Sequence, residues 1–159
     1  MPQDVLRRTL VELLLSPLAH VMPERAFDGV RPELRYLRPP GREHSLWELL
    51  EHMRLAQEDI LRYCLDPGWT SPAFPEGYWP APGLVPAEGA WTQTRAGFEK
   101  DLKAVVALVR DPGVDLASAL PHAPKHTYLR EVLLVADHNA YHAGQAVELR
   151  RALGDWPSG

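Results

Sequence analysis

Two histidines that could bind one metal ion together, His138 and His142, lie four residues apart in an apolar segment near the C-terminus. On a helix this spacing puts both imidazoles on one face with Cβ atoms about 5–6 Å apart, so that each can offer a ring nitrogen to the same ion. The alternative is a pair of polar side chains satisfied by backbone carbonyls or water. The apolar surroundings favour the metal site, because burying two imidazoles without a ligand costs desolvation free energy.

A third ligand has to come from one of five other histidines. These are His20, His44, His52, His122 and His126. Only His52 lies in the middle of a predicted helix, whereas most of the others lie beside a helix cap or in a proline-containing loop, where histidines are usually solvated. Metal sites in helical bundles are built from side chains that project inward from facing helices. We therefore predict that His52, His138 and His142 form the site.

Four further side chains could act beside the predicted ion. Asp59 follows His52 by two helical turns and could orient a ligand or serve as a catalytic base, but a surface or helix-pairing charge fits equally well. His20, at the end of the first predicted helix, could line the mouth of a pocket. Gln145 and Tyr141 could contact a bound ligand, although Tyr141 is expected chiefly as a core residue.

Three neutral imidazoles would leave an ion with open coordination positions, unlike the closed sphere of a structural site. An open ion lowers the pKa of a bound water or thiol, which leads to hydrolysis or to attack on an electrophile. Zinc and nickel both suit imidazole, and ligand type does not separate them. The single cysteine, Cys64, could be a nucleophile, but its helical surroundings indicate a small core residue.

Hydrophobic residues recur at helical spacing in four long segments. These are about Gln3–Leu18, Ser45–Leu65, Glu88–Arg110 and Thr127–Leu153, with a short helical piece at 20–27. Ser45 and Glu48 form a capping box at the start of the second segment. No strand-like alternation of useful length is present, so the pattern predicts an all-α four-helix bundle in up-down order, although its long loops permit a crossover.

Two long loops contain several prolines. The connection from Pro67 to Gly89 holds six prolines besides aromatic residues, so it should lie on the bundle, either covering core or walling the pocket. The second loop runs from Val114 to His126. In the last helix, apolar and small residues lie opposite the histidines on a helical wheel. We therefore expect this helix to be the most buried and to approach another helix or a partner subunit closely.

The composition is that of one soluble globular domain spanning residues 1–159. Hydrophobic residues make up 45% and charged residues 24% of the chain. The net charge of −4 and the lack of a basic run argue against a nucleic-acid partner. No apolar stretch reaches the ~20 residues that span a bilayer. A single cysteine cannot form an internal disulfide, which fits a cytoplasmic protein.

The last helical segment carries the motif D-H-N-x-Y-H-x-G-Q at residues 137–145. With a histidine in the second long helix, this motif resembles the DinB/YfiT-like superfamily of bacterial metal-binding four-helix bundles. Supporting stretches are Trp47–His52, Ala56–Leu61, Pro75–Pro80 and Leu129–His138. The resemblance covers essentially the whole chain and implies a divalent metal on His52, His138 and His142, and a homodimer. Family members include S-transferases and isomerases that use low-molecular-weight thiols, besides many proteins without known activity.

Three functions are consistent with these observations. The first is a divalent-metal-dependent enzyme acting on a small molecule, either an S-transferase that uses a low-molecular-weight thiol or a hydrolase. The second is a non-catalytic dimeric bundle that binds metal or a small molecule. The third is a metal-free bundle that serves as an interaction dimer. The sequence does not identify a substrate.

Overall fold

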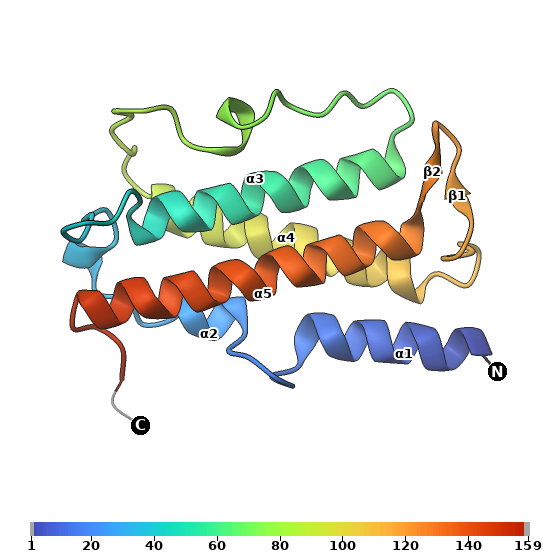
Figure 1. Cartoon of the computed structure of the whole chain (residues 1–159), viewed down its shortest axis with the longest axis horizontal. Coiled ribbons are helices and arrows are strands. Elements are labelled where there is room, and N and C mark those ends of the chain that lie inside the picture. The colour runs from blue at the N-terminus through green and yellow to red at the C-terminus, as the bar shows by residue number, and fades with distance from the viewer. Residues whose placement is uncertain (1, 158–159) are drawn as a thin grey trace.

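The computed structural model describes residues 2–157 as a mainly helical protein (Figure 1). Its helices are α1 (Pro2–Leu15), α2 (Pro23–Phe27), α3 (Leu46–Leu65), α4 (Ala90–Arg110) and α5 (Tyr128–Ala152). Shorter elements are the 3-10 helices η1 (Pro32–Leu34) and η2 (Glu76–Tyr78), and an antiparallel hairpin of β1 (Ala119–Leu120) and β2 (Ala123–Thr127). The prediction of a mainly helical chain is confirmed. The all-α prediction missed the hairpin, whose strands are too short to show an alternating pattern.

Two helix ends differ from their predicted positions for local steric reasons. α1 ends at Leu15, before its predicted end, because Pro17 disfavours the helical conformation in the residue that precedes it. α4 begins at Ala90 rather than at Glu88, because its N-cap Gly89 has a φ of 78°, in the left-handed region.

The predicted capping box at the start of α3 is confirmed. The backbone N–H of Glu48 donates to Ser45 Oγ (3.2 Å), and the backbone N–H of Ser45 donates to Glu48 Oε2 (2.8 Å). Arg38 Nε also donates to Glu48 Oε2 (2.9 Å). Burial alone would raise the pKa of Glu48, but the hydrogen bonds with Arg38 and Ser45 and the Arg38 charge outweigh it and lower the pKa to about 2.

Because the pKa of Glu48 is lower in the folded than in the unfolded chain, its contribution to stability is complete above pH 4.5 and is lost as the pH falls toward 2. In Glu48→Gln the cap is retained, since glutamine also serves at this position, but the titration is removed. We expect the free energy of unfolding to fall more steeply with decreasing pH in the wild type than in Glu48→Gln. The difference between the two slopes should correspond to the uptake of at most about one proton on unfolding. Urea unfolding of both proteins between about pH 5 and pH 3 measures this. Parallel curves would contradict it.

α3 and α4 run in the same direction. Near the start of both helices, Trp47 Nε1 donates to Thr94 Oγ1 (3.2 Å), and further along both helices Gln57 Nε2 donates to the backbone carbonyl of Phe98 (2.8 Å). The up-down order is therefore wrong between these helices, and the crossover permitted by the long loops is what occurs. Segment 66–89 returns along the outside of α3 to reach the start of α4, while α5 runs antiparallel to α3 (Figure 1).

The core consists of two apolar clusters. The first is formed by α2, α3, α4 and α5, with Leu46, Met53 and Ala143 fully buried in it. The second joins α1, α4 and α5 with Leu61 of α3, and Val109 and Leu116 are fully buried in it. Together they fix α5 against α3, which sets the spacing of the side chains that these two helices share. Among the described helices, none combines the length and apolar character that a membrane span requires.

α5 is not buried all round, which corrects the expectation from the helical wheel. Its exposed stripe comprises Leu133, Asp137, Tyr141, Gly144, Glu148 and Arg151. Tyr141 is 65% exposed, so its assignment to the core is wrong. The opposite side carries Ala143 and Ala146, which are fully buried and let α5 pack closely within the chain. The wheel failed because Leu133 and Gly144 are apolar or small yet lie on the exposed face.

Candidate metal centre

The imidazoles of His52, on α3, and of His138 and His142, on α5, meet between these two helices. His52 Nε2 lies 3.1 Å from His138 Nε2 and 3.1 Å from His142 Nε2. One nitrogen of each ring lies within 4.8 Å of the other two. His52 and His142 are buried, and His138 is partly exposed. The structure thus brings together all three residues that the sequence suggested as ligands.

The other ring nitrogen of two of these histidines has a partner of its own. His52 Nδ1 lies 2.7 Å from the backbone carbonyl oxygen of Tyr78, and His142 Nδ1 lies 2.7 Å from Gln145 Oε1. A carbonyl oxygen can only accept, so each Nδ1 carries the proton and donates. In a neutral imidazole this leaves Nε2 with a lone pair, and both of these lone pairs point toward the shared centre.

Burial keeps the three imidazoles neutral. It lowers the pKa of His138 to about 3, with a further contribution from the neighbouring His142 and His52. Burial also lowers the pKa of His142 to about 4, against the opposing hydrogen bond to Gln145. The pKa of His52 is lowered by burial too, against its bond to Tyr78. At neutral pH all three therefore present the form of imidazole that binds metals.

The residues present fit a divalent ion. With Zn–N bonds of about 2.0–2.1 Å, tetrahedral geometry places neighbouring nitrogens roughly 3.3 Å apart, close to the 3.1 Å that separates His52 Nε2 from the other two nitrogens. The lone pairs of His52 and His142 repel each other at this distance unless a cation lies between them. A donor set of neutral nitrogens suits zinc and nickel alike.

Trp79 supports His52 from one face. The two rings stack with centroids 3.9 Å apart and planes 2° from parallel, and His44 stacks on the opposite face of the indole at 3.9 Å. Sequence reasoning missed Tyr78 and Trp79 and discounted His44. The aromatic content of segment 66–89 was the available signal, but nothing in it specifies which aromatic residue meets which helix.

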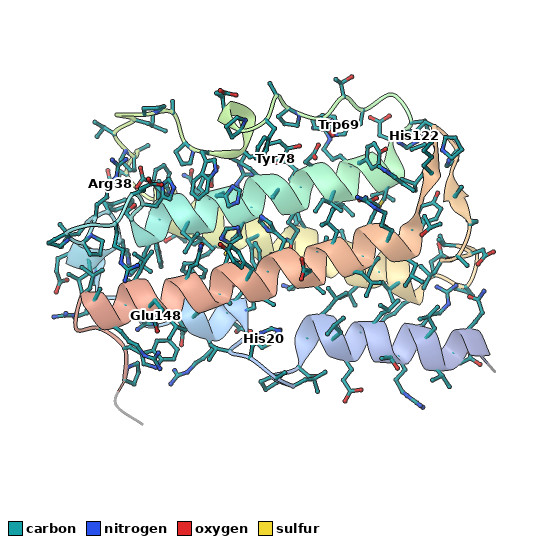
Figure 2. The ribbon with its side chains drawn as sticks, in the orientation of Figure 1. His20, Arg38, Trp69, Tyr78, His122 and Glu148 are labelled. Carbon is teal, nitrogen blue, oxygen red and sulfur yellow. The ribbon has the colours of Figure 1, made fainter. Side chains whose placement is uncertain are left out.

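Asp59 lies on the same face of α3 as His52 and is buried, with 8% exposed. Its Oδ1 accepts a hydrogen bond from Trp69 Nε1 (2.7 Å) and its Oδ2 accepts one from the Tyr78 hydroxyl (2.7 Å). Burial and the bond to Asp59 raise the pKa of Tyr78 to about 12, so this hydroxyl stays protonated and donates. Figure 2 shows Trp69 and Tyr78 between segment 66–89 and α3. The catalytic role of Asp59 stays a prediction, since both of its oxygens already accept bonds within the chain.

A groove of about 850 Å³ opens beside the metal centre. His20, Tyr141 and Gln145, the three residues suggested as pocket-lining, all line it, together with His44. Two of its lining residues contact His142 directly: Gln145 Oε1 accepts from His142 Nδ1, and the Tyr141 ring meets the His142 ring with centroids 4.9 Å apart. His44 is linked to His52 only through the indole of Trp79. The three histidines do not line the groove themselves, so a small molecule in it would contact the residues that pack against the candidate centre.

A second histidine pair lies at the far end of α3, beside the hairpin where Figure 2 labels His122. The Tyr63 hydroxyl lies 3.1 Å from His126 Nδ1, and the Tyr63 ring meets His122 edge-on with centroids 4.9 Å apart. Both ring nitrogens of His122 are buried, so the expectation that it is solvated is wrong, whereas the His126 side chain is 37% exposed. Over residues 2–157, the histidine group that could hold an ion includes neither of them.

Cys64 is a core residue, with 6% exposed. Burial, with a contribution from the charge of Glu131, raises the pKa of its thiol to about 12. Because the thiolate is the reactive form, we expect Cys64 to react with a disulfide reagent at least about 100-fold more slowly in the native protein than in denaturant. Absorbance of the released thiol at mildly alkaline pH measures both rates. Comparable rates would restore Cys64 as a candidate nucleophile.

Residues 21–146 match the family described as the DinB superfamily. This match covers most of the chain and includes all three histidines of the candidate metal centre as well as segment 66–89. Neither a curated protein nor a solved structure matches the chain.

Proposed function

The chain belongs to the DinB superfamily, and from this premise we propose that it is a divalent-metal-dependent enzyme acting on a small molecule, either a thiol-dependent S-transferase or a hydrolase. The observation that carries the proposal is the convergence of three neutral imidazoles beside a groove of about 850 Å³. A purely structural site would be closed by four protein ligands. The long helices α1, α3, α4 and α5 would then form the DinB/YfiT-type four-helix bundle.

In this proposal His52, His138 and His142 hold the ion, with zinc and nickel as the candidate metals. A divalent ion there supplies Lewis acidity that activates a water or a thiol. The protein's own part is to hold the imidazoles in place, through Gln145 on one ring and segment 66–89 on another. Gln145, Tyr141 and His20 would contact the substrate in the groove.

The test starts with protein purified without a histidine tag. Elemental analysis gives the metal content, and the apo and reconstituted forms are then assayed with low-molecular-weight thiols plus electrophiles, and with esters and amides. We expect turnover that depends on the metal for at least one of these classes. Stoichiometric metal without turnover of any substrate would favour the non-catalytic binding module, and protein that takes up no metal would overturn the proposal altogether.

We also propose that the protein is a homodimer, as the family resemblance implies. The exposed stripe of α5 supports this, because Leu133 and Tyr141 put large apolar side chains, 44% and 65% exposed, on one helical face. Sedimentation equilibrium should return the mass of two chains, and the mass of one chain would contradict the proposal.

A further inference from the structure

A continuous path of hydrogen bonds links Asp59 to His52 through a single residue of segment 66–89. Asp59 Oδ2 accepts from the Tyr78 hydroxyl (2.7 Å), and the Tyr78 carbonyl oxygen accepts from His52 Nδ1 (2.7 Å). We propose that Asp59 and Tyr78 are positioning residues, which together fix the ring orientation and the tautomer of His52, so that an unprotonated Nε2 faces the other two histidines. The proposal deepens the metal site proposed above and rests on it only for its metal readout.

The spacing along α3 explains why Tyr78 is needed. His52 and Asp59 are seven residues apart, which places them on one face but about 10 Å apart along the helix axis. Asp59 therefore cannot bond to the imidazole directly. Tyr78 spans the gap, because its hydroxyl reaches Asp59 while its main chain reaches His52.

The stacked indole of Trp79 cannot fix the orientation of the His52 ring alone. Its contact at 3.9 Å and 2° fixes the plane of the His52 ring. A half-turn of the imidazole about its Cβ–Cγ bond keeps that plane but puts Cδ2 where Nδ1 lies and Cε1 where Nε2 lies. The Tyr78 carbonyl favours the observed orientation, since a C–H at that edge would make no comparable hydrogen bond, and it holds the proton on Nδ1. Asp59 keeps the Tyr78 carbonyl beside His52 Nδ1, because it accepts a hydrogen bond from the hydroxyl of the same tyrosine.

The competing explanation is that Asp59 merely fastens the loop to α3. It also accepts a hydrogen bond from Trp69 Nε1 (2.7 Å), which touches Asp59 but has no bond to His52. This second bond offers a matched control. Tyr78→Phe removes the bond on the path to His52, whereas Trp69→Phe removes the bond that lies off it.

The first experiment uses the apo protein, with ¹⁵N-labelled histidine and long-range ¹H–¹⁵N correlation spectra. In the wild type, His52 should show one tautomer, with the proton on Nδ1. In Tyr78→Phe and Asp59→Asn we expect a mixture of tautomers, while Trp69→Phe should keep the wild-type pattern. The same spectrum in all four proteins, or an equal change in Tyr78→Phe and Trp69→Phe, would overturn the proposal.

The second experiment measures zinc affinity by competition with a chelator. Loss of the partner of a metal-binding histidine typically costs 10–100-fold, so we expect binding about 10-fold weaker or more in Tyr78→Phe and Asp59→Asn. Trp69→Phe, and Val109→Ala as a destabilised core variant far from the site, should stay near the wild type. If affinity falls in step with stability in all four variants, the effect is structural and the proposal fails. A wild type that binds no zinc overturns the metal site, but the tautomer measurement still decides this inference.

Discussion

Replacing His138 by alanine should abolish tight metal binding. His138 Nε2 is one of three nitrogens at the centre, and the described chain offers no fourth histidine in this group to replace it. Loss of a mere outer partner costs 10–100-fold in metal affinity, so loss of a ligand should cost more than about 100-fold. A ligand at about a hundredfold excess over its Kd stabilises the folded state by roughly 2.7 kcal/mol. Removing metal should therefore lower the Tm of the wild type and leave that of His138→Ala unchanged.

The control is His122→Ala, which also removes a partly buried imidazole, but from the far end of α3. It should keep the metal content of the wild type. Elemental analysis and calorimetry, each with and without chelator, give both readouts. Equal metal in His138→Ala and the wild type would place the ion elsewhere. Circular dichroism shows whether each variant is folded.

Arg150→Ala should be the most destabilising single substitution of a charged residue near the C-terminus of α5. Arg150 is 3% exposed and pairs through Nε with Asp155 Oδ2 (3.2 Å). Its Nη1 donates to the backbone carbonyls of Ala26 (3.1 Å) and Asp28 (2.7 Å), which tie α2 to α5. Removing Arg150 leaves both backbone carbonyls and Asp155 Oδ2 without this donor, although Asp155 Oδ1 still accepts from Arg31 Nε (2.9 Å), so we expect a loss of up to about 3–5 kcal/mol. Chemical denaturation followed by tryptophan fluorescence measures the loss.

The neighbouring arginine is the natural comparison. Arg151 pairs with Glu148, but their side chains are 59% and 56% exposed. Exposed pairs contribute little, so Arg151→Ala should change the free energy of unfolding by less than about 1 kcal/mol. Arg150→Met fills more of the space left by the arginine side chain, so it should lower the free energy of unfolding less than Arg150→Ala does. Similar losses in Arg150→Ala and Arg151→Ala would show that the buried cluster around Asp155 does not hold the C-terminal turn.

The convergence of the three histidines could be predicted because they lie on regular helices. The i, i+4 spacing places His138 and His142 on one face whatever the surroundings, and His52 was the only remaining histidine in mid-helix. The capping box of α3 was equally local, since Ser45 and Glu48 lie within one turn. The histidine pair and the capping box needed only residues a few positions apart, whereas His52 was identified by elimination among the remaining histidines.

What could not be predicted depends on contacts between distant segments. The partner of His52 is the backbone carbonyl of Tyr78, and a carbonyl has no residue type to recognise. The exposed face of α5 includes Leu133 and Gly144, so hydrophobicity gave the wrong face. No local signal indicated that α3 and α4 run in the same direction either, because a long connection can join parallel or antiparallel helices.

The shared direction of α3 and α4 sets a lower limit on the connection between them. α3 has 20 residues and is therefore about 30 Å long, a distance that an extended chain covers in roughly nine residues. The 24 residues of segment 66–89 exceed this minimum, and the excess is what forms η2 and places Tyr78 and Trp79 against His52. We expect a linker shortened to about nine residues still to join the helices, but to have no residues left over for η2. The length of this linker is therefore part of what gives His52 its hydrogen-bond acceptor and its stacked indole.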